Sequence, residues 1–436
     1  MNIVDIITKK LNNKTLSPKE IEYFVKTSVS GQTADYQVSA LLAAIFVNGM
    51  NDEETFFLTK YMMESGDILD FSSVSGIKAD KHSTGGVADT VTLIAAPAAA
   101  SCGVRIIKMS GRGLGYSGGT IDKLSAIPGF TTDISKDEAL KMSEKSGIVI
   151  MGQTDTLAPA DKKFYALRDV TGTVESAPLI VSSILSKKLA SGADTIVFDV
   201  KCGNGAFMKN INSAKSLALQ LTGISSMFGK KTAAVISDMS QPLGMNIGNS
   251  LEVIEAIEVL KGNVEGDLYE LSCLIGGCMV FQAQKTKSLE DGVVLIKKSI
   301  KTGQALSKFE EFVAQQGGNA KIINNYGLLP KAGSKIDIKA DKNGYINSIN
   351  TQLIGRASVE TGAGRIKKND SIDLGAGIIM NARIGDFVKE DDILLTILSS
   401  TSEKCLSAAE IAKNAFEILP CPIEKPILIK DIITKE

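Results

Sequence analysis

The only histidine of the chain, His82, lies in a short segment whose residue types favour proton transfer beside a bound anion. This segment, residues 81–86, has the sequence KHSTGG. Histidine can donate or accept a proton near neutral pH, and a cation, two hydroxyls and a glycine pair together suit an anion. A surface histidine beside a glycine turn is the alternative, because a short motif needs supporting context.

A second glycine-rich stretch occupies residues 110–120, and residues 113–118 within it match the dinucleotide-binding pattern G-x-G-x-x-G. That pattern requires a long helix after the last glycine and an acidic residue about 20 positions further on. Here Pro128 and Gly129 end any helix early. We therefore expect a loop that holds an anion with backbone amides and hydroxyls. The two segments together offer phosphate the donors Lys81, Ser83, Lys108, Ser110 and Thr120.

A third polar group lies on and before a helix predicted to begin near Pro178. Ser183 and Lys187 are neighbours on one face of that helix because they are four positions apart, and Arg168 precedes it. A solvated helix face is the usual role of such a pair, but the surrounding residues are apolar. A cation, a hydroxyl and a guanidinium are suitable donors to a planar heterocycle that bears carbonyl groups.

The elements that must position these residues change in character along the chain. Residues 1–66 have helical spacing, with capping boxes at Ser17 to Glu20 and at Asn51 to Glu54. From residue 67, apolar runs at 104–109, 148–151, 195–200 and 232–236 alternate with helical segments. This alternation predicts a mostly parallel sheet, whose ligands collect at the carboxyl ends of the strands. Beyond about residue 335 the pattern indicates short strands and turns.

Composition and charge narrow the class of protein. The 436 residues include 48 Lys and Arg against 49 Asp and Glu, a net charge of −1, which argues against nucleic acid and membranes as main partners. The longest apolar stretch, residues 91–104, contains Pro97 and is too short to span a bilayer. The N-terminal residues lack a secretion signal. We expect a cytoplasmic protein whose six cysteines are reduced and mostly buried.

Several motifs then give the chain a resemblance to a known family. They are KHSTGGV (81–87), KMSGRGLG followed by GGT (108–120), YALRDVT (165–171), ISDMSQPLG (236–244) and LEVIEA (251–256). With these motifs in register, the sequence resembles the thymidine and pyrimidine-nucleoside phosphorylases. The resemblance implies reversible phosphorolysis of uridine, thymidine and deoxyuridine by inorganic phosphate, which gives the free base and (deoxy)ribose 1-phosphate, with no organic cofactor.

The resemblance also implies roles for individual residues. The base is held, and the chemistry carried out, by His82, Arg168, Ser183 and Lys187. Phosphate is bound by Lys81, His82, Ser83, Thr92, Lys108, Met109, Ser110 and Thr120. Cleavage of the bond to C1′ builds positive charge on the sugar and negative charge on the base. Arg168 and Lys187 would stabilise that anion, and His82 would donate a proton or hydrogen bond to a ring carbonyl.

Members of this family hold a structural monovalent cation, K⁺. The matching positions here are Ala88, Thr90, Leu243, Asn246 and Glu255. Ala88 stands where glycine is expected, which preserves a carbonyl ligand unless the site requires a positive φ, where a Cβ is costly. The other departures from the family pattern, none of which removes a catalytic group, are Tyr116, Ser117, Ser125 and Cys202.

The family architecture combines α/β and all-α parts. It implies a small helical domain from residues 1–66 with 160–192, which binds the base and forms a homodimer. A large α/β domain with a mixed, mostly parallel sheet, residues 67–159 with 193–335, binds phosphate. A β-rich C-terminal α+β subdomain follows at 336–436. Closure about connectors near Gly66, Gly152 and Gly192 would assemble the site.

Alternatives remain at this stage. The overall match is closer to the broad pyrimidine-nucleoside enzymes than to a strict thymidine phosphorylase. A phosphoribosyltransferase of similar fold is another possibility, since residues 84–89 resemble its diphosphate loop, but such enzymes depend on Mg²⁺ and lack the Arg168, Ser183 and Lys187 set. A non-catalytic nucleoside-binding protein would have no need of His82.

Overall fold

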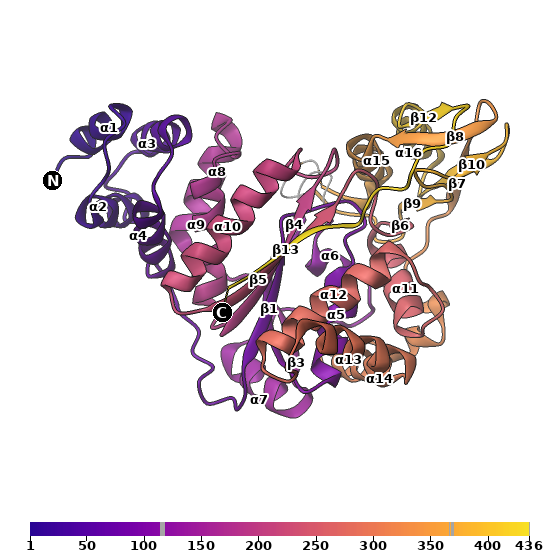
Figure 1. The fold of residues 1–436 in the computed structure, drawn as a ribbon, viewed down its shortest axis with the longest axis horizontal. Coiled ribbons are helices and arrows are strands. Elements are labelled where there is room, and N and C mark those ends of the chain that lie inside the picture. The colour runs from indigo at the N-terminus through magenta and orange to yellow at the C-terminus, as the bar shows by residue number, and fades with distance from the viewer. Residues whose placement is uncertain (114–117, 366, 368–369, 436) are drawn as a thin grey trace.

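The computed structural model describes residues 1–113, 118–365, 367 and 370–435. The departures at Tyr116 and Ser117, and with them the middle of the glycine-rich stretch, lie outside the described residues. Figure 1 shows helices at one end, a sheet with flanking helices in the centre and a β-rich region at the other end. The predicted fold class is therefore confirmed.

The helical region is formed by two segments that are far apart in the sequence. The first contains α1 (Ile3–Leu11), α2 (Pro18–Val29), α3 (Asp35–Asn48) and α4 (Asp52–Met63), and the second contains α8 (Pro159–Thr171) and α9 (Ala177–Ala190). The predicted capping boxes begin α2 and α4. Helix α9 packs along α4, and α8 packs against α2 and α3. Phe24 and Phe164 stack in this interface with ring centroids 4.9 Å apart.

The central sheet has the strand order β13-β5-β4-β1-β2-β3. Its strands are β1 (Lys78–Ser83), β2 (Arg105–Ser110), β3 (Ile148–Gly152), β4 (Thr195–Cys202), β5 (Lys231–Asp238) and β13 (Ile429–Lys435). Strands β1 to β5 are parallel, and β13 runs antiparallel to β5. The predicted strands β2 to β5 are confirmed, whereas β1 and β13 are absent from the predicted set.

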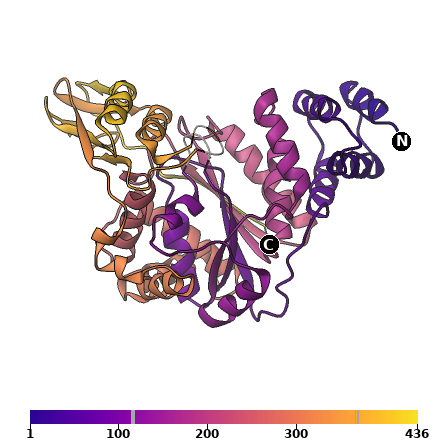
Figure 2. The same ribbon diagram turned by 180° about the vertical axis from the view of Figure 1, so that it is seen from behind.

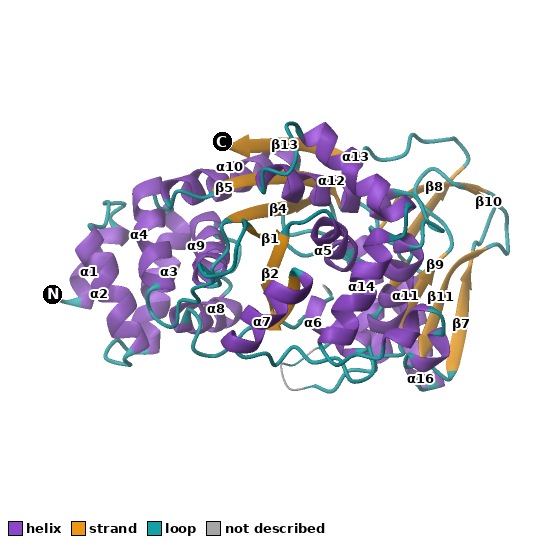
Figure 3. Ribbon diagram, turned by 90° about the horizontal axis from the view of Figure 1, so that it is seen from below, coloured by secondary structure: helices purple, strands orange, loops and turns teal. Residues whose placement is uncertain are grey.

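Helices cover both faces of this sheet (Figure 3). One face packs on α5 (Val91–Ser101) and α12 (Asp267–Gln282), with α11 (Asn249–Leu260), α13 (Leu289–Lys301) and α14 (Gln304–Gln315) beyond them. The other face packs on α7 (Lys136–Ser146), α9 and α10 (Ile211–Met227). Side chains alternate between the faces, so Val197 lies in the core with α5 while Phe198 lies in the core with α9.

The C-terminal region contains two small sheets, of order β10-β8-β12 and β6-β9-β11-β7. Its elements are β7 (Ser334–Lys339), β8 (Gly344–Ile349), α15 (Thr351–Ser358), a π-helical turn (Val359–Ala363), β9 (Gly377–Met380), β10 (Phe387–Val388), β11 (Ile393–Ser399), α16 (Ser402–Ala412) and β12 (Phe416–Leu419). Two strands pair with the sheet on the other side of the domain boundary expected between residues 335 and 336. Strand β6 (Asn246–Ile247) pairs with β9, and β13 returns to the central sheet (Figure 1).

Connectors between the helical region and the sheet lie against one another, and Figure 2 shows the one that leaves α4. Asp67 N donates to Thr156 O at 2.9 Å, and Leu69 N donates to Ala190 O at 2.8 Å. Gly192 has φ +81°, and a Cβ there would lie 2.7 Å from Leu69 O. Glycine is therefore required where these connectors cross.

The predicted burial of most cysteines is confirmed, since Cys202, Cys273, Cys278 and Cys405 are buried. No helix in the described part of the chain is long and apolar enough to cross a membrane.

Candidate active site

The alternation of side chains along β1 separates Lys81 from His82. Ala79 lies in the core with α5, so Lys81 and Ser83 extend from that face of the sheet. His82 is paired in register with Phe198, which packs on α9. Phosphate-binding candidates therefore start on one face of β1, and His82 starts on the face covered by the helix of the base-binding candidates.

Lys81 lies in a buried cluster of charges. Its Nζ is 3.2 Å from Asp199 Oδ2 and 3.5 Å from Asp89 Oδ2. Burial alone would lower the pKa of Lys81, but the two carboxylates raise it above its ordinary value. Lys201 Nζ also lies 2.7 Å from Asp199 Oδ2. Although burial opposes it, the charges of the lysines around Asp89 hold the pKa of that carboxyl far below its usual range. Lys81 is therefore a permanent cation.

Lys108 and Lys188 share another buried carboxylate, Asp80. Lys108 Nζ is 3.3 Å from Asp80 Oδ1 and donates to Lys81 O. Lys188 Nζ, on α9, is 2.7 Å from Asp80 Oδ2 and donates to Met109 O at 2.8 Å. Burial, together with the positive charges of Lys188 and Lys81, lowers the pKa of Lys108 to about 7, because Asp80 opposes these effects only in part.

These connected ion pairs carry a surplus of positive charge. The buried lysines Lys81, Lys108, Lys188 and Lys201 face the carboxylates of Asp80, Asp89 and Asp199, which leaves one positive charge in excess when Lys108 is protonated. An uncompensated buried charge is costly. A phosphate ion at the carboxyl ends of β1 and β2 would supply the missing negative charge.

His82 is half-buried at the end of β1. Burial lowers the pKa of its imidazole well below the usual range, and so do the positive charges of Lys188, Lys108, Lys187 and Lys81. The imidazole is therefore neutral near pH 7, and it carries one N–H donor and one acceptor nitrogen. The ion pair between Lys188 of α9 and Asp80 of β1 shows that this helix and strand are in contact here.

Ser183 and Lys187 lie together on α9, as their spacing predicts. Lys187 Nζ is 3.3 Å from Ser183 Oγ and 2.6 Å from Asp161 Oδ2 of α8. The Asp161 side chain is 3% exposed, whereas the Lys187 side chain is 26% exposed. The buried carboxylate of Asp161 thus holds Lys187 in place and leaves its ammonium group partly accessible.

Arg168 is buried in the last turn of α8, just before the loop that leads to α9. Its guanidinium donates to Thr173 O and Leu179 O, each at 3.2 Å, and to Val174 O. Burial lowers its pKa, and the negative charge of Asp161 opposes this. In this structure Arg168 holds the loop that joins α8 to α9.

The remaining phosphate-binding candidates lie around the ends of β1 and β2. Ser83 Oγ accepts a hydrogen bond from Gly85 N at 3.2 Å, and Ser110 ends β2. Met109 is buried and offers its carbonyl to Lys188. Thr92 lies in the first turn of α5, and Thr120 begins the short helix α6 (Thr120–Ser125).

Comparison with known proteins covers all parts of the chain. A family model for the a/b domain of a glycosyl transferase family matches residues 75–306, and one for its helical bundle domain matches 4–66. The pyrimidine nucleoside phosphorylase C-terminal domain matches residues 345–419. The curated pyrimidine-nucleoside phosphorylases of Geobacillus stearothermophilus and Staphylococcus haemolyticus are each 48% identical to this chain, with 100% of both chains covered. The chain belongs to the pyrimidine-nucleoside phosphorylase family.

Membership of the phosphorylase family makes the protein a pentosyltransferase. The anthranilate phosphoribosyltransferase of Thermus thermophilus has the same fold, with a TM-score of 0.58, 20% identity, and coverage of 71% of this chain and 98% of that one. The likeness at this identity concerns the fold alone.

The five positions predicted from the sequence to hold a cation lie near one another, around the loop before α5 and the first turns of α11. Leu243 N donates to Val87 O at 3.1 Å, and Gly244 N donates to Ala88 O at 3.3 Å. Glu255 accepts hydrogen bonds from Met245 N at 2.7 Å and Asn246 N at 3.1 Å. Ala88 has φ +56°, so this position does require the left-handed conformation in which a Cβ is costly. Thr90 Oγ1 donates to Glu252 Oε2 at 2.6 Å.

The structure adds residues that the sequence does not single out. Lys188 and Asp80 join the wall of α9 to Lys108, and Asp161 holds Lys187. Asp199 and Lys201 occupy alternate positions of the otherwise apolar strand β4. Charged residues inside a buried strand are the signal that could have marked this pair. No group of three or more His, Cys, Asp or Glu side chains within the described ranges is arranged to hold a metal ion.

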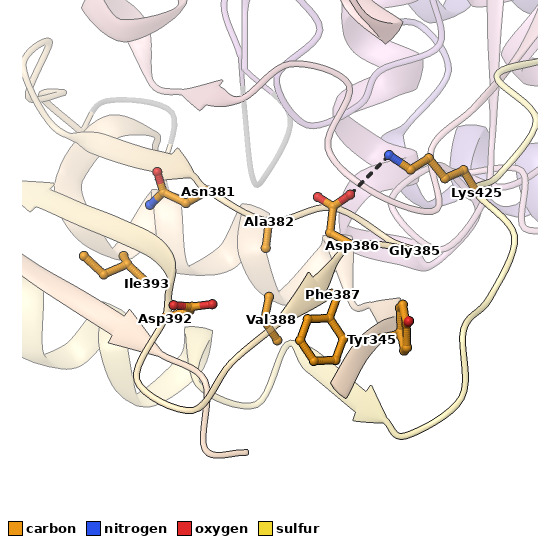
Figure 4. A pocket seen from close by; sticks show the side chains of 10 residues that line it. All are labelled: Tyr345, Asn381, Ala382, Gly385, Asp386, Phe387, Val388, Asp392, Ile393 and Lys425. Atoms are coloured by element: carbon orange, nitrogen blue, oxygen red, sulfur yellow. Dashed lines mark ion pairs between the residues drawn. The ribbon is translucent and has the colours of Figure 1, made fainter. Parts of the chain in front are cut away.

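A cavity of about 700 Å³ lies away from these residues, in the C-terminal region. Figure 4 shows that Tyr345 and Phe387 lie on one side of it and that Asp386 pairs with Lys425. None of the residues that line it belongs to the motifs shared with the phosphorylase family.

Lys108 gives this phosphorylase a testable pH dependence. Phosphate should raise the melting temperature less at about pH 9 than at about pH 7.5, because a neutral Lys108 must take up a proton when the anion binds. Inorganic phosphate is mainly the dianion at both pH values, so its own titration would only strengthen binding at the higher pH. The free protein should become more stable as pH rises from about 7 towards 10, because the unfolded lysine keeps a proton that the folded one has lost.

Differential scanning fluorimetry with and without phosphate tests both effects. In Lys108→Met, the phosphate-induced shift should be smaller and should no longer decline between these pH values. An undiminished decline in that variant would assign the proton to another group.

Proposed function

We propose that this protein catalyses the reversible phosphorolysis of uridine, thymidine and deoxyuridine. The observation that carries the proposal is the contact between the ends of β1 and β2, which bear buried lysines, and helix α9, which bears Ser183 and Lys187. The buried lysine surplus at the ends of β1 and β2 suits phosphate. Ser183 and Lys187 on α9 suit a pyrimidine base, and His82 extends from the face of β1 that α9 covers.

In the proposed reaction, the polar side chains act where charge develops on the departing base. An oxygen of phosphate forms a bond to C1′ as the bond from C1′ to N1 of the base breaks, and the bonding electrons leave with the base. Lys187 stabilises the negative charge that spreads onto the ring carbonyls. The neutral imidazole of His82 donates its N–H to one of those carbonyls. Phosphate is already a nucleophilic anion, so its lysine and hydroxyl ligands contribute chiefly by positioning it.

The proposal is tested by measuring kcat/KM for uridine, thymidine and deoxyuridine with inorganic phosphate and without Mg²⁺. We expect turnover of all three nucleosides, because Lys108 is compatible with a 2′-hydroxyl. Turnover of thymidine and deoxyuridine alone would identify a strict thymidine phosphorylase. Activity only with a sugar diphosphate and Mg²⁺ would identify a phosphoribosyltransferase.

We also propose that Ala88, Thr90, Leu243, Asn246 and Glu255 hold K⁺. The observation in favour is the buried carboxylate of Glu255, which accepts hydrogen bonds from the backbone amides of Met245 and Asn246. Burial and the charge of Glu252 raise the pKa of Glu255 to about 7, although the two amides and Arg383 oppose this. Carboxylate and carbonyl oxygens are the ligands that hard cations prefer. Bound K⁺ would supply the positive charge that keeps Glu255 ionised and would fasten the loop before α5 to the loop after β5.

This cation site should reveal itself in the melting temperature. Relative to choline chloride, KCl should stabilise the protein more at about pH 8 than at about pH 6, because a proton on Glu255 competes with K⁺ at the lower pH. Glu255→Gln should remove the difference between the two salts. Equal effects of K⁺ and choline on the natural protein would contradict the proposal.

We further propose a homodimer formed through the helical region. Tyr36 and Val47 lie about three helical turns apart on α3 and share a face, and they are 77% and 76% exposed. Val170 on the adjacent helix α8 is 79% exposed. Light scattering after gel filtration should give twice the mass of the chain, and Tyr36→Glu with Val47→Glu should give the monomer mass. A monomer in the natural protein would refute the proposal.

A further inference from the structure

The C-terminal region reaches the glycine-rich loop of the α/β domain through one side chain. Arg365, which follows the π-helical turn, has Nη1 2.8 Å from Asp122 Oδ2 on α6 and 3.4 Å from Gly113 O. Arg365 and Asp122 are both buried. Nearby, Asn249 Nδ2 donates to Ala363 O at 2.9 Å, so the chain that presents Arg365 is itself fastened.

Asp122 lies at the base of the glycine-rich loop, where Gly113 and Gly119 meet; we call this place the neck of the loop. Its Oδ2 accepts a hydrogen bond from Gly113 N at 2.7 Å, and its Oδ1 lies 3.1 Å from Arg112 Nη1. At the other end of the loop, a Cβ on Gly119 would lie 2.1 Å from Gly113 N. The two ends of the loop therefore touch, and only glycine fits at Gly119.

The neck lies between two of the proposed phosphate ligands. Ser110 precedes Gly113 at the end of β2, and Thr120 follows Gly119 at the start of α6. A change in the separation of Gly113 and Gly119 would change the spacing of the Ser110 and Thr120 hydroxyls. The carboxylate of Asp122 fixes that separation.

We propose that Arg365 is a positioning residue for phosphate, which acts through Asp122 on the neck of the loop. This inference rests on the proposed phosphorolysis. The Arg112 side chain is 59% exposed, so Arg365 supplies the buried cation of the pair. A charge-assisted bond inside the protein is stronger than an exposed one. The C-terminal region thus takes part in phosphate binding without touching the substrate.

A small cavity beside the neck shows what truncation would do. It has a volume of about 30 Å³ and is lined by residues that include Gly113, Gly119, Asp122 and Arg365. Such a space holds about one water molecule. Truncation of Arg365 would enlarge it and admit more water, which would compete with Gly113 N for the carboxylate of Asp122.

The test measures KM separately for phosphate and for uridine in Arg365→Ala, Arg365→Lys and Asp122→Asn. We expect Arg365→Ala to raise KM for phosphate about tenfold, which is the effect of losing one charged hydrogen bond. KM for uridine should change less than about twofold, because the base-binding residues lie on α9. Arg365→Lys keeps the charge and should recover part of the loss. In Arg365→Ala combined with Asp122→Asn, the effects should not add, because both substitutions break the same contact.

Asn204→Ala is the matched control. Asn204 also joins the C-terminal region to the α/β domain, since it donates to Ile349 O at 2.8 Å and accepts from Thr351 N at 2.8 Å. Its loss should lower the melting temperature without a change in KM for phosphate. An equal rise in KM for phosphate in this control, or equal rises for both substrates in Arg365→Ala, would overturn the proposal.

A separate readout distinguishes this proposal from the proposed reaction. The phosphate-induced rise in melting temperature reports phosphate binding without turnover. Absence of turnover in the natural protein would refute the proposed function. A normal phosphate-induced shift in Arg365→Ala would refute the role of Arg365 whatever the reaction is.

Discussion

Replacing His82 with Ala should lower kcat for uridine phosphorolysis by about 10² to 10³, the usual contribution of a positioned proton or hydrogen-bond donor. KM for phosphate should change far less, because His82 extends from the α9 side of β1, opposite to Lys81 and Ser83. Steady-state kinetics with each substrate varied in turn measure both quantities. Equal losses in kcat and in phosphate affinity would make His82 a phosphate ligand instead.

His82→Gln is the informative partner of this variant. Its amide keeps an N–H donor but cannot be protonated near neutral pH. The surrounding lysines and burial already keep His82 neutral, so we expect His82→Gln to recover about tenfold of the kcat that His82→Ala loses. No recovery would indicate that the imidazole transfers a proton instead of donating a hydrogen bond.

Much of this fold is predictable from local sequence patterns, because helices and most strands depend on the order of apolar and polar residues that are close in the chain. Strands β2 to β5 appear as apolar runs between helical segments, and α9 begins at Ala177, with Pro178 in its first turn as predicted. The strand β1, by contrast, has the sequence KADKHS, with no apolar alternation. Asp80 and Lys81 are buried there because other charges pair with them. A local pattern contains no record of those partners.

Distant pairing limits the prediction in the same way. Strand β13 pairs with β5, which lies far upstream, and the short strand β6 pairs with β9. Neither pairing can be recognised from the residues of the strand itself. The boundary between the α/β domain and the C-terminal subdomain is therefore a property of the folded chain, and the Arg365 contact with Asp122 crosses it as well.

The candidate site shows this limit at the level of single residues. Lys187 and Lys188 are adjacent, and their types are identical. Successive helical residues point about 100° apart, so Lys187 meets Asp161 and stays accessible, while Lys188 is buried against Asp80. The helical pattern places both lysines on the same predicted helix. Which of them can meet a substrate depends on the carboxylates that α8 and β1 contribute.

Replacing Lys187 with Met should lower kcat/KM for uridine by about 10² to 10³, because a preorganised charge that meets the departing base is lost. The substitution also leaves Asp161 as a buried carboxylate without its cation, and Asp161 Oδ1 already has no hydrogen-bond partner among the described residues. An unpaired buried charge is destabilising, so the melting temperature should fall as well.

A second substitution separates the two effects of Lys187→Met. In Asp161→Asn combined with Lys187→Met, the buried charge is gone, so the melting temperature should recover while kcat/KM stays low. Lys162→Met is the matched control, because Lys162 lies on α8 in an exposed ion pair with Asp155 at 2.7 Å, and it should leave both quantities within about twofold of the natural protein. If the double variant recovered its activity together with its stability, Lys187 would serve only to neutralise Asp161. If activity stays low in a stable protein, the ammonium group of Lys187 acts on the base itself.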